Sequence, residues 1–184
     1  MRYKIASGKA ALAMSFALSI VCPLVAHADI IALQIPNIPG DAKFATNNGL
    51  PADSIRVLTV GNSVEFSGGT GGGGSVGKAI FSNLSIVKKF GESSAPLFLS
   101  VATGRFVPSA TVSFYRVKQG VPVRYYTILL DDVSVRSQKW VGNANGVDGA
   151  DAENIELAYS RIRLRDEESG VTVCYDIKTL SQCQ

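Results

Sequence analysis

The clearest chemical pattern in the sequence lies in the glycine-rich stretch before Lys78. Gly72 and the pair Gly77-Lys78 satisfy most of G-x-x-x-x-G-K-[ST], a loop whose backbone N–H groups hold phosphates. Ala79, however, stands where a Ser or Thr hydroxyl would bind magnesium. The alternating residues after Lys78 predict a strand, whereas a phosphate loop needs a helix N-terminus there. We interpret residues 68–77 as a connection between strands, and a nucleotide hydrolase acting through Lys78 is the weakest of our hypotheses.

Acidic residues offer two further candidates for chemistry. Asp131 and Asp132 could act as paired carboxylates in acid–base catalysis, but neighbouring residues of a strand point to opposite faces. Asp148 and Asp151 lie in a polar loop and could bind calcium, but that loop lacks the carboxylate spacing and the terminal Glu of an EF-hand. We interpret both pairs as structural, and we predict no catalytic residue, no cofactor and no metal site.

The first 28 residues have the features of a secretory signal peptide. A basic start precedes an unbroken run of apolar or small residues over 10–21, and Ala26-His27-Ala28 forms a small-x-small cleavage pattern. We expect cleavage between Ala28 and Asp29, and export to the periplasm or the medium with no membrane association afterwards. The alternative is an uncleaved membrane anchor. The predicted domains are the signal peptide, residues 1–28, and a single domain of ordinary size, residues 29–184.

Removal of the signal peptide changes the composition that matters for function. The formal net charge is +3 at pH 7, and the signal peptide holds three basic residues, Arg2, Lys4 and Lys9. The mature chain is therefore nearly neutral, without the basic surface typical of nucleic-acid-binding proteins. The one histidine, His27, also leaves with the signal peptide, so the mature chain lacks the commonest general base.

Two cysteines remain in the mature chain, Cys174 and Cys183, because Cys22 belongs to the signal peptide. An export route favours oxidation, so the two are candidates for a disulfide bond. A bond that closes so short a loop stabilises a fold by about 2–3 kcal/mol. The alternative is a pair of free thiols in a loose tail.

The elements that must position these residues are mostly strands. Alternation of apolar and polar residues predicts strands over 29–35, 54–66, 78–90, 109–117, 123–140, 153–165 and 171–177. Gly, Asn and Pro predict loops between them. About seven or eight strands and one short helix, without an internal repeat, indicate a mainly β protein: an antiparallel two-sheet sandwich or barrel with the helix packed alongside.

The helix is expected within the stretch 77–110. Ser93 and Ser94 can cap its first N–H groups, and Pro96 fits its first turn. Gly104 supplies a left-handed residue that ends it. The apolar side chains expected on its inner face are Leu97, Phe98, Val101 and Ala102.

Arginines at 161, 163 and 165 lie on one face of the strand predicted over 153–165. Such a row usually forms a solvated surface. It could instead line a channel or pair with acids of a neighbouring subunit.

The motifs of the chain, taken in order, resemble the Hcp (haemolysin-coregulated protein) family, the tube protein of the type VI secretion system. The resemblance begins at 35–40, IPNIPG, and is strongest from Gly77 through Lys88, Pro96 and the turn at 102–105, ATGR, to the step Val107-Pro108. It continues in three later motifs: Leu130-Asp131-Asp132-Val133-Ser134-Val135, Glu153-Asn154-Ile155-Glu156-Leu157 and Tyr175-Asp176-Ile177.

The resemblance implies a small β-barrel of two packed sheets with one helix, and subunits that form hexameric rings stacked into a hollow tube. It implies no enzyme activity, and its partners would be further copies, other type VI secretion components and effectors carried inside the ring. The signal peptide, the glycine-rich segment and the two cysteines depart from that pattern. The alternative is therefore a Sec-exported, periplasmic or secreted binding module that keeps the fold without the tube role.

Overall fold

The computed structural model describes residues 30–40, 50–67, 77–141 and 151–183. The predicted signal peptide with its cleavage site Ala28–Asp29, the glycine-rich residues 68–76 and the loop residues 142–150, including Asp148, lie outside this part. The described residues contain no helix with the length and apolarity that crossing a membrane requires.

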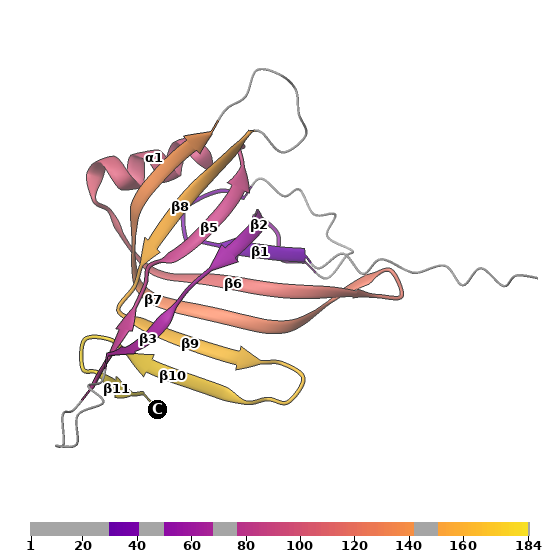
Figure 1. Cartoon of the computed structure of the whole chain (residues 1–184). Coiled ribbons are helices and arrows are strands. Elements are labelled where there is room, and N and C mark those ends of the chain that lie inside the picture. Colours follow the sequence, from indigo (N-terminus) through magenta and orange to yellow (C-terminus); the bar gives the residue numbers. More distant parts are fainter. Residues whose placement is uncertain (1–29, 41–49, 68–76, 142–150, 184) are drawn as a thin grey trace, which may run out of the picture.

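Six antiparallel strands close into a barrel, as Figure 1 shows. Their order around the barrel is β7-β6-β1-β2-β5-β8, and the pairing of β8 with β7 closes the circle. The strands are β1 (Ile30–Gln34), β2 (Ile55–Gly61), β5 (Leu84–Lys89), β6 (Phe106–Lys118), β7 (Val121–Val141) and β8 (Ala152–Ala158).

The longest strand, β7, belongs to the barrel and to a sheet that extends from it. Its residues Tyr126–Asp131 pair with β9 (Arg161–Asp166), whereas the segment from Ser134 to Val141 pairs with β8. Between these two segments, Asp132 has a positive φ of 50°. Beyond β9 the sheet continues through β10 (Thr172–Asp176) and β11 (Ser181–Gln182), and a separate hairpin is formed by β3 (Val64–Ser67) and β4 (Lys78–Phe81).

The predicted fold class is confirmed, but the predicted number of strands was too low. Three long predicted strands each break at a pair of residues, 62–63, 82–83 and 159–160, and the described part of the chain contains eleven strands. The chain leaves the barrel for the hairpin at 62–63, enters it from the hairpin at 82–83, and leaves it for the extended sheet at 159–160. Alternation continues on both sides of each break, so the sequence pattern does not reveal it.

Polar side chains compensate for the backbone pairing lost at these breaks. The Asn62 side-chain amide donates to the Ser82 carbonyl (3.2 Å) and to the Tyr159 hydroxyl (2.9 Å), and that hydroxyl donates to the same carbonyl (3.2 Å). One residue from each break takes part, so all three breaks lie together. We call Asn62, Ser82 and Tyr159 the break cluster.

The barrel interior holds the main hydrophobic core. Alternate residues of each barrel strand point inward, and the side chains with 0% exposure include Leu33, Ile55, Leu84, Ile86, Val112, Leu130, Val133, Ile155 and Leu157. Each such aliphatic side chain contributes about 1.5–3 kcal/mol through burial.

The helix α1 (Ser94–Thr103) packs against β7 at one end of the barrel. It ends as predicted, since Gly104 has a left-handed φ of 63°. Its predicted inner face is confirmed for Leu97, which is buried, and for Val101, which is half-buried against the core. It was wrong for Phe98, which is 51% exposed, and for Ala102, which is exposed, whereas Ser100 is buried. The structure also differs from the prediction that serine side chains cap the helix. Ser93 is the N-cap residue, but its side chain makes no capping hydrogen bond, and the Ser94 hydroxyl donates to the Glu153 carboxylate (2.7 Å).

Candidate functional surfaces

A buried ion pair lies where α1 meets the barrel. Lys88 and Glu153 are direct partners across β5 and β8, both side chains have 0% exposure, and Nζ lies 2.6 Å from Oε1. The ammonium group also donates to the Lys89 carbonyl (2.7 Å). The carboxylate accepts from the Ser94 hydroxyl and from the Gln138 amide, which also donates to the Ser94 carbonyl. The pair therefore ties the first residue of α1 to three barrel strands.

This pair was not predicted from the sequence, in which Lys88 simply belonged to the strand predicted over 78–90. The signal was nevertheless present, because Lys88 follows Leu84 and Ile86 at intervals of two, on the face that points inward. Glu153 precedes Ile155 and Leu157 in the same way.

The aspartate pair at 131–132 lies where β7 changes partner. Asp132 accepts from the Ser160 hydroxyl (2.8 Å) and from Lys178 Nζ (2.9 Å), and the Lys178 hydrogen bond is the main reason why the pKa of Asp132 lies below its usual 3.8. Asp131 lies 3.5 Å from the guanidinium of Arg161. The two carboxylates thus bind different cations and join β7 to β9 and to the segment after β10. A lowered pKa keeps Asp132 ionised near neutrality, which does not suit a general acid.

Lys78 begins strand β4, in agreement with the predicted strand. Its carbonyl accepts from the Ser67 hydroxyl (3.1 Å) across the β3–β4 hairpin. Gly77 has a packing role, because a Cβ there would lie 2.1 Å from the Phe66 ring. Gly72 lies outside the described residues. No group of three or more His, Cys, Asp or Glu side chains within the described ranges could hold a metal ion.

The arginine row on β9 is partly paired within the chain. Arg161 contacts Asp131 and Asp176 (3.5 and 3.2 Å), and Arg165 contacts Glu167 (3.0 Å). Arg163 forms no ion pair with the residues that the structure describes. Arg161 and Arg165 therefore have acidic partners within the chain and do not need acids of a neighbouring subunit to form ion pairs.

The two cysteines lie at the end of the extended sheet. The Cα atoms of Cys174 and Cys183 are 5.1 Å apart, their sulfurs are within bonding distance, and the backbone N–H of Cys183 donates to the Cys174 carbonyl (3.1 Å). Cys174 is 7% exposed and Cys183 is half-buried.

Two groups of exposed apolar side chains belong to elements that lie well apart in the fold, α1 and the β3–β4 hairpin (Figure 1). The helix patch consists of Phe98 and Trp140, whose rings are 5.7 Å apart, together with Leu99, the exposed residue that follows Phe98 on α1. The hairpin patch consists of Val64 and Phe66 on one face of the β3–β4 hairpin, where Phe66 is 73% exposed, and the exposed Ile80 lies on the opposite face because it pairs with Glu65. Neighbouring large side chains left in water are typical of protein–protein contact surfaces.

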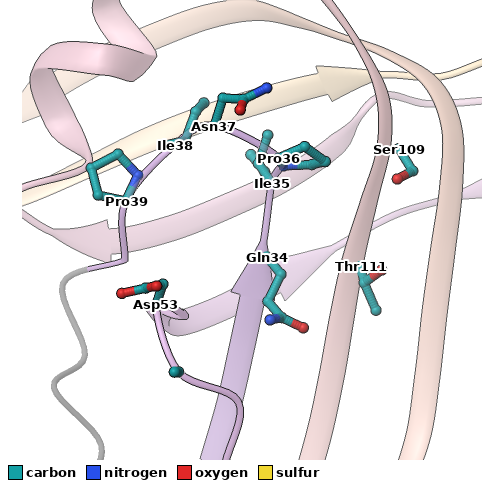
Figure 2. Close-up of a pocket in the computed structure, with 10 residues that line it drawn as sticks. Gln34, Ile35, Pro36, Asn37, Ile38, Pro39, Asp53, Ser109 and Thr111 are labelled. Carbon is teal, nitrogen blue, oxygen red and sulfur yellow. The ribbon is translucent and has the colours of Figure 1, made fainter.

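Two hollows complete the candidate surfaces. A polar cleft of 670 Å³ lies between the turn after β1 and strand β6, and Figure 2 shows Asp53, Ser109 and Thr111 around it. Among the described residues that line this cleft, Asp53 is the one with an ionisable side chain, so these residues provide no acid–base pair. An apolar pocket of 560 Å³ lies between the β3–β4 hairpin and the extended sheet, where the rings of Phe81 and Tyr175 stack at 5.0 Å.

Comparison with known proteins identifies the family. The family model described as "Type VI secretion system effector, Hcp" matches residues 33–165, well over half of the chain. The comparison with curated proteins found no match.

Solved structures with the same fold agree with this family. Hcp1 from Salmonella typhimurium is 23% identical, with 85% of this chain and 99% of that chain covered and a TM-score of 0.71. Hcp1 from the E. coli EAEC 042 pathovar is 21% identical, with 81% and 97% covered and a TM-score of 0.68. Secreted protein Hcp3 from Pseudomonas aeruginosa is 18% identical, with 82% and 98% covered and a TM-score of 0.60. This chain belongs to the Hcp family of the type VI secretion system.

Proposed function

We propose that this protein is a non-enzymatic structural component associated with type VI secretion, and that its copies form hexameric rings of the kind the family stacks into a tube. The observation that carries this proposal is the family match over residues 33–165. The family-implied role extends to effectors carried inside the ring.

The two apolar patches support assembly. A ring requires each copy to be contacted on two different surfaces at once, because a head-to-tail contact must repeat until it closes. The helix patch and the hairpin patch provide apolar surface on two elements that lie well apart in the fold, α1 and the β3–β4 hairpin. Burial of such patches between copies would supply the main favourable term for association.

The absence of enzyme activity is part of the proposal. The sequence candidates for chemistry serve the fold instead: Lys78 begins a strand, and Asp131 and Asp132 hold ion pairs. A nucleotide-binding assay on the parent chain and on Lys78→Ala should show no binding in either protein.

Size measurement tests the ring. The mature chain, residues 29–184, is expected to elute in light-scattering chromatography with the mass of six copies and to form rings by electron microscopy. A monomer that persists at high micromolar concentration would contradict the ring.

We further propose that residues 1–28 direct Sec export, with cleavage between Ala28 and Asp29, and that Cys174 and Cys183 are bonded in the exported protein.

The apolar pocket of 560 Å³ favours a second candidate function, an exported binding module with the Hcp fold but without the tube role. Cell fractionation separates the two functions. A Sec block that traps the precursor, together with a periplasmic mature form in cells that lack the sheath, would favour the binding module. N-terminal sequencing of the mature protein tests the cleavage site.

A further inference from the structure

The last segment of the described chain is held by few noncovalent contacts. Strand β11 pairs with β10 through two residue pairs, Tyr175 with Gln182 and Asp176 with Ser181. The side chains of Ser181 and Gln182 are exposed, and Leu180 is 46% exposed. Ile177, at the start of the segment 177–183, is half-buried, but none of the side chains from Lys178 to Gln182 is buried, so apolar packing anchors the segment only at its first residue and at Cys183.

One backbone hydrogen bond, from Ile177 N–H to the Ser160 carbonyl (2.8 Å), fixes the start of the segment, and polar contacts beyond Ile177 add little. The turn after β10 is organised by the Asp176 carboxylate, which accepts from the backbone N–H groups of Lys178 (2.9 Å) and Thr179 (3.1 Å). The ion pair between Lys178 and Asp132 has both side chains more than 60% exposed (68% and 61%), and exposed pairs contribute little. Leu180 adopts a positive φ of 53°, an uncommon conformation for a leucine.

We infer that a Cys174–Cys183 bond acts as a redox latch for this segment. In the oxidised chain the bond holds residues 177–183 against β10. In the reduced chain the segment separates, which uncovers the backbone edge of β10 at Tyr175 and Asp176 and removes Gln182 from the wall of the apolar pocket. The inference rests on the bond proposed above, but it does not depend on ring formation.

The reaction requires a dithiol reductant. Its thiolate attacks the sulfur of Cys183, since Cys183 is half-buried whereas Cys174 is 7% exposed. The S–S bond breaks, a mixed disulfide forms on Cys183, and the Cys174 sulfur leaves and takes up a proton. The second thiol of the reductant then attacks the mixed disulfide and frees the Cys183 thiol. The two cysteines gain two electrons and two protons in total, and the reductant becomes a disulfide.

The rest of the fold does not depend on the Cys174–Cys183 bond. The closed barrel is held by six paired strands and a continuous apolar core, to which the segment 177–183 contributes no buried side chain. Reduction should therefore release the segment and leave the barrel folded, since regions with few buried contacts open at low free energy.

Hydrogen exchange on the mature chain tests the latch. The unreduced mass of the protein purified from the periplasm should be lower by two hydrogens than the mass after reduction. Amide exchange is then measured for the oxidised chain, for the same chain with a dithiol reductant, and for Cys183→Ser. We expect the amides of 174–183 to exchange about tenfold faster, or more, in the last two samples, with no change in β5, β6 and β8.

Ser181→Ala serves as the matched control, because it removes the 2.8 Å contact between the Thr179 and Ser181 hydroxyls and keeps both cysteines. It should behave like the oxidised parent. Equal exchange of 174–183 in all samples would overturn the latch, as would loss of protection throughout the barrel on reduction. A chain purified with two free thiols would overturn the bond and the latch together, whereas the mass of the assembled protein would still report on the ring.

Discussion

Lys88 and Lys89 are neighbours with the same side chain and opposite environments. Lys88 points into the barrel and pairs with Glu153, and both have 0% exposure, whereas Lys89 is exposed. A buried pair is costly to desolvate, but removal of one partner is costlier, because it leaves an uncompensated charge. The pair therefore specifies how α1 sits on the barrel more than it adds net stability.

This contrast gives a prediction for single residues. Lys88→Met should lower the free energy of unfolding by about 3–5 kcal/mol, because Glu153 then stays buried without its cation. Lys89→Met is the matched control and should change it by less than about 0.5 kcal/mol. Urea denaturation followed by circular dichroism measures both. Equal stability of the two variants would contradict the buried pair.

At the scale of elements, the three breaks explain how one barrel carries a hairpin and an extended sheet. Strands β2, β5 and β8 all leave or enter the barrel at the break cluster, where Asn62, Ser82 and Tyr159 satisfy one another. Burial raises the pKa of Tyr159 above its usual 10.0, although the hydrogen bond from Asn62 lowers it in part, so the hydroxyl stays protonated and can donate to Ser82.

Removal of that hydroxyl tests the break cluster. Tyr159→Phe should lower the free energy of unfolding by about 1–2 kcal/mol, because the Ser82 carbonyl and the Asn62 amide each lose a partner. Tyr125→Phe keeps the ring that lies 4.1 Å from the Arg116 guanidinium, so it should have little effect. Thermal unfolding monitors both variants. If Tyr159→Phe proves as stable as Tyr125→Phe, the cluster does not hold the breaks together.

At the scale of the whole molecule, the apolar residues left in water bear on assembly. The helix patch and the hairpin patch belong to elements that lie well apart, α1 and the β3–β4 hairpin, so both could be covered at once by other copies. We predict that Phe98→Ser and Phe66→Ser each shift the assembled protein toward smaller species without loss of the fold, because each removes an aromatic anchor from one contact.

Light-scattering chromatography at one fixed concentration measures this shift. Leu58→Ser is the control, since Leu58 is a 45% exposed apolar residue on β2 outside both patches. Assembly of both phenylalanine variants to the size of the parent would show that neither patch lies in a contact between copies.

Local patterns in the sequence determined the mainly β class, most strand positions, the helix and its end at Gly104, and the order of motifs that marks the family. These features depend on residues close in the chain, on alternation and on turn residues. Alternation also placed Lys88 and Glu153 on inward faces, although only the pairing of β5 with β8 brings them together.

Tertiary structure alone decided the rest. The breaks at 62–63, 82–83 and 159–160 follow from the hairpin and the extended sheet that the chain joins beyond them, and the exposure of Phe98 follows from the narrow contact of α1 with the barrel. The role of Asp131 and Asp132 as ion-pair partners depends on Arg161 and Lys178, which belong to later segments of the chain. Contacts between residues far apart in the chain leave no periodic signal, so a pattern read along the sequence cannot reveal them.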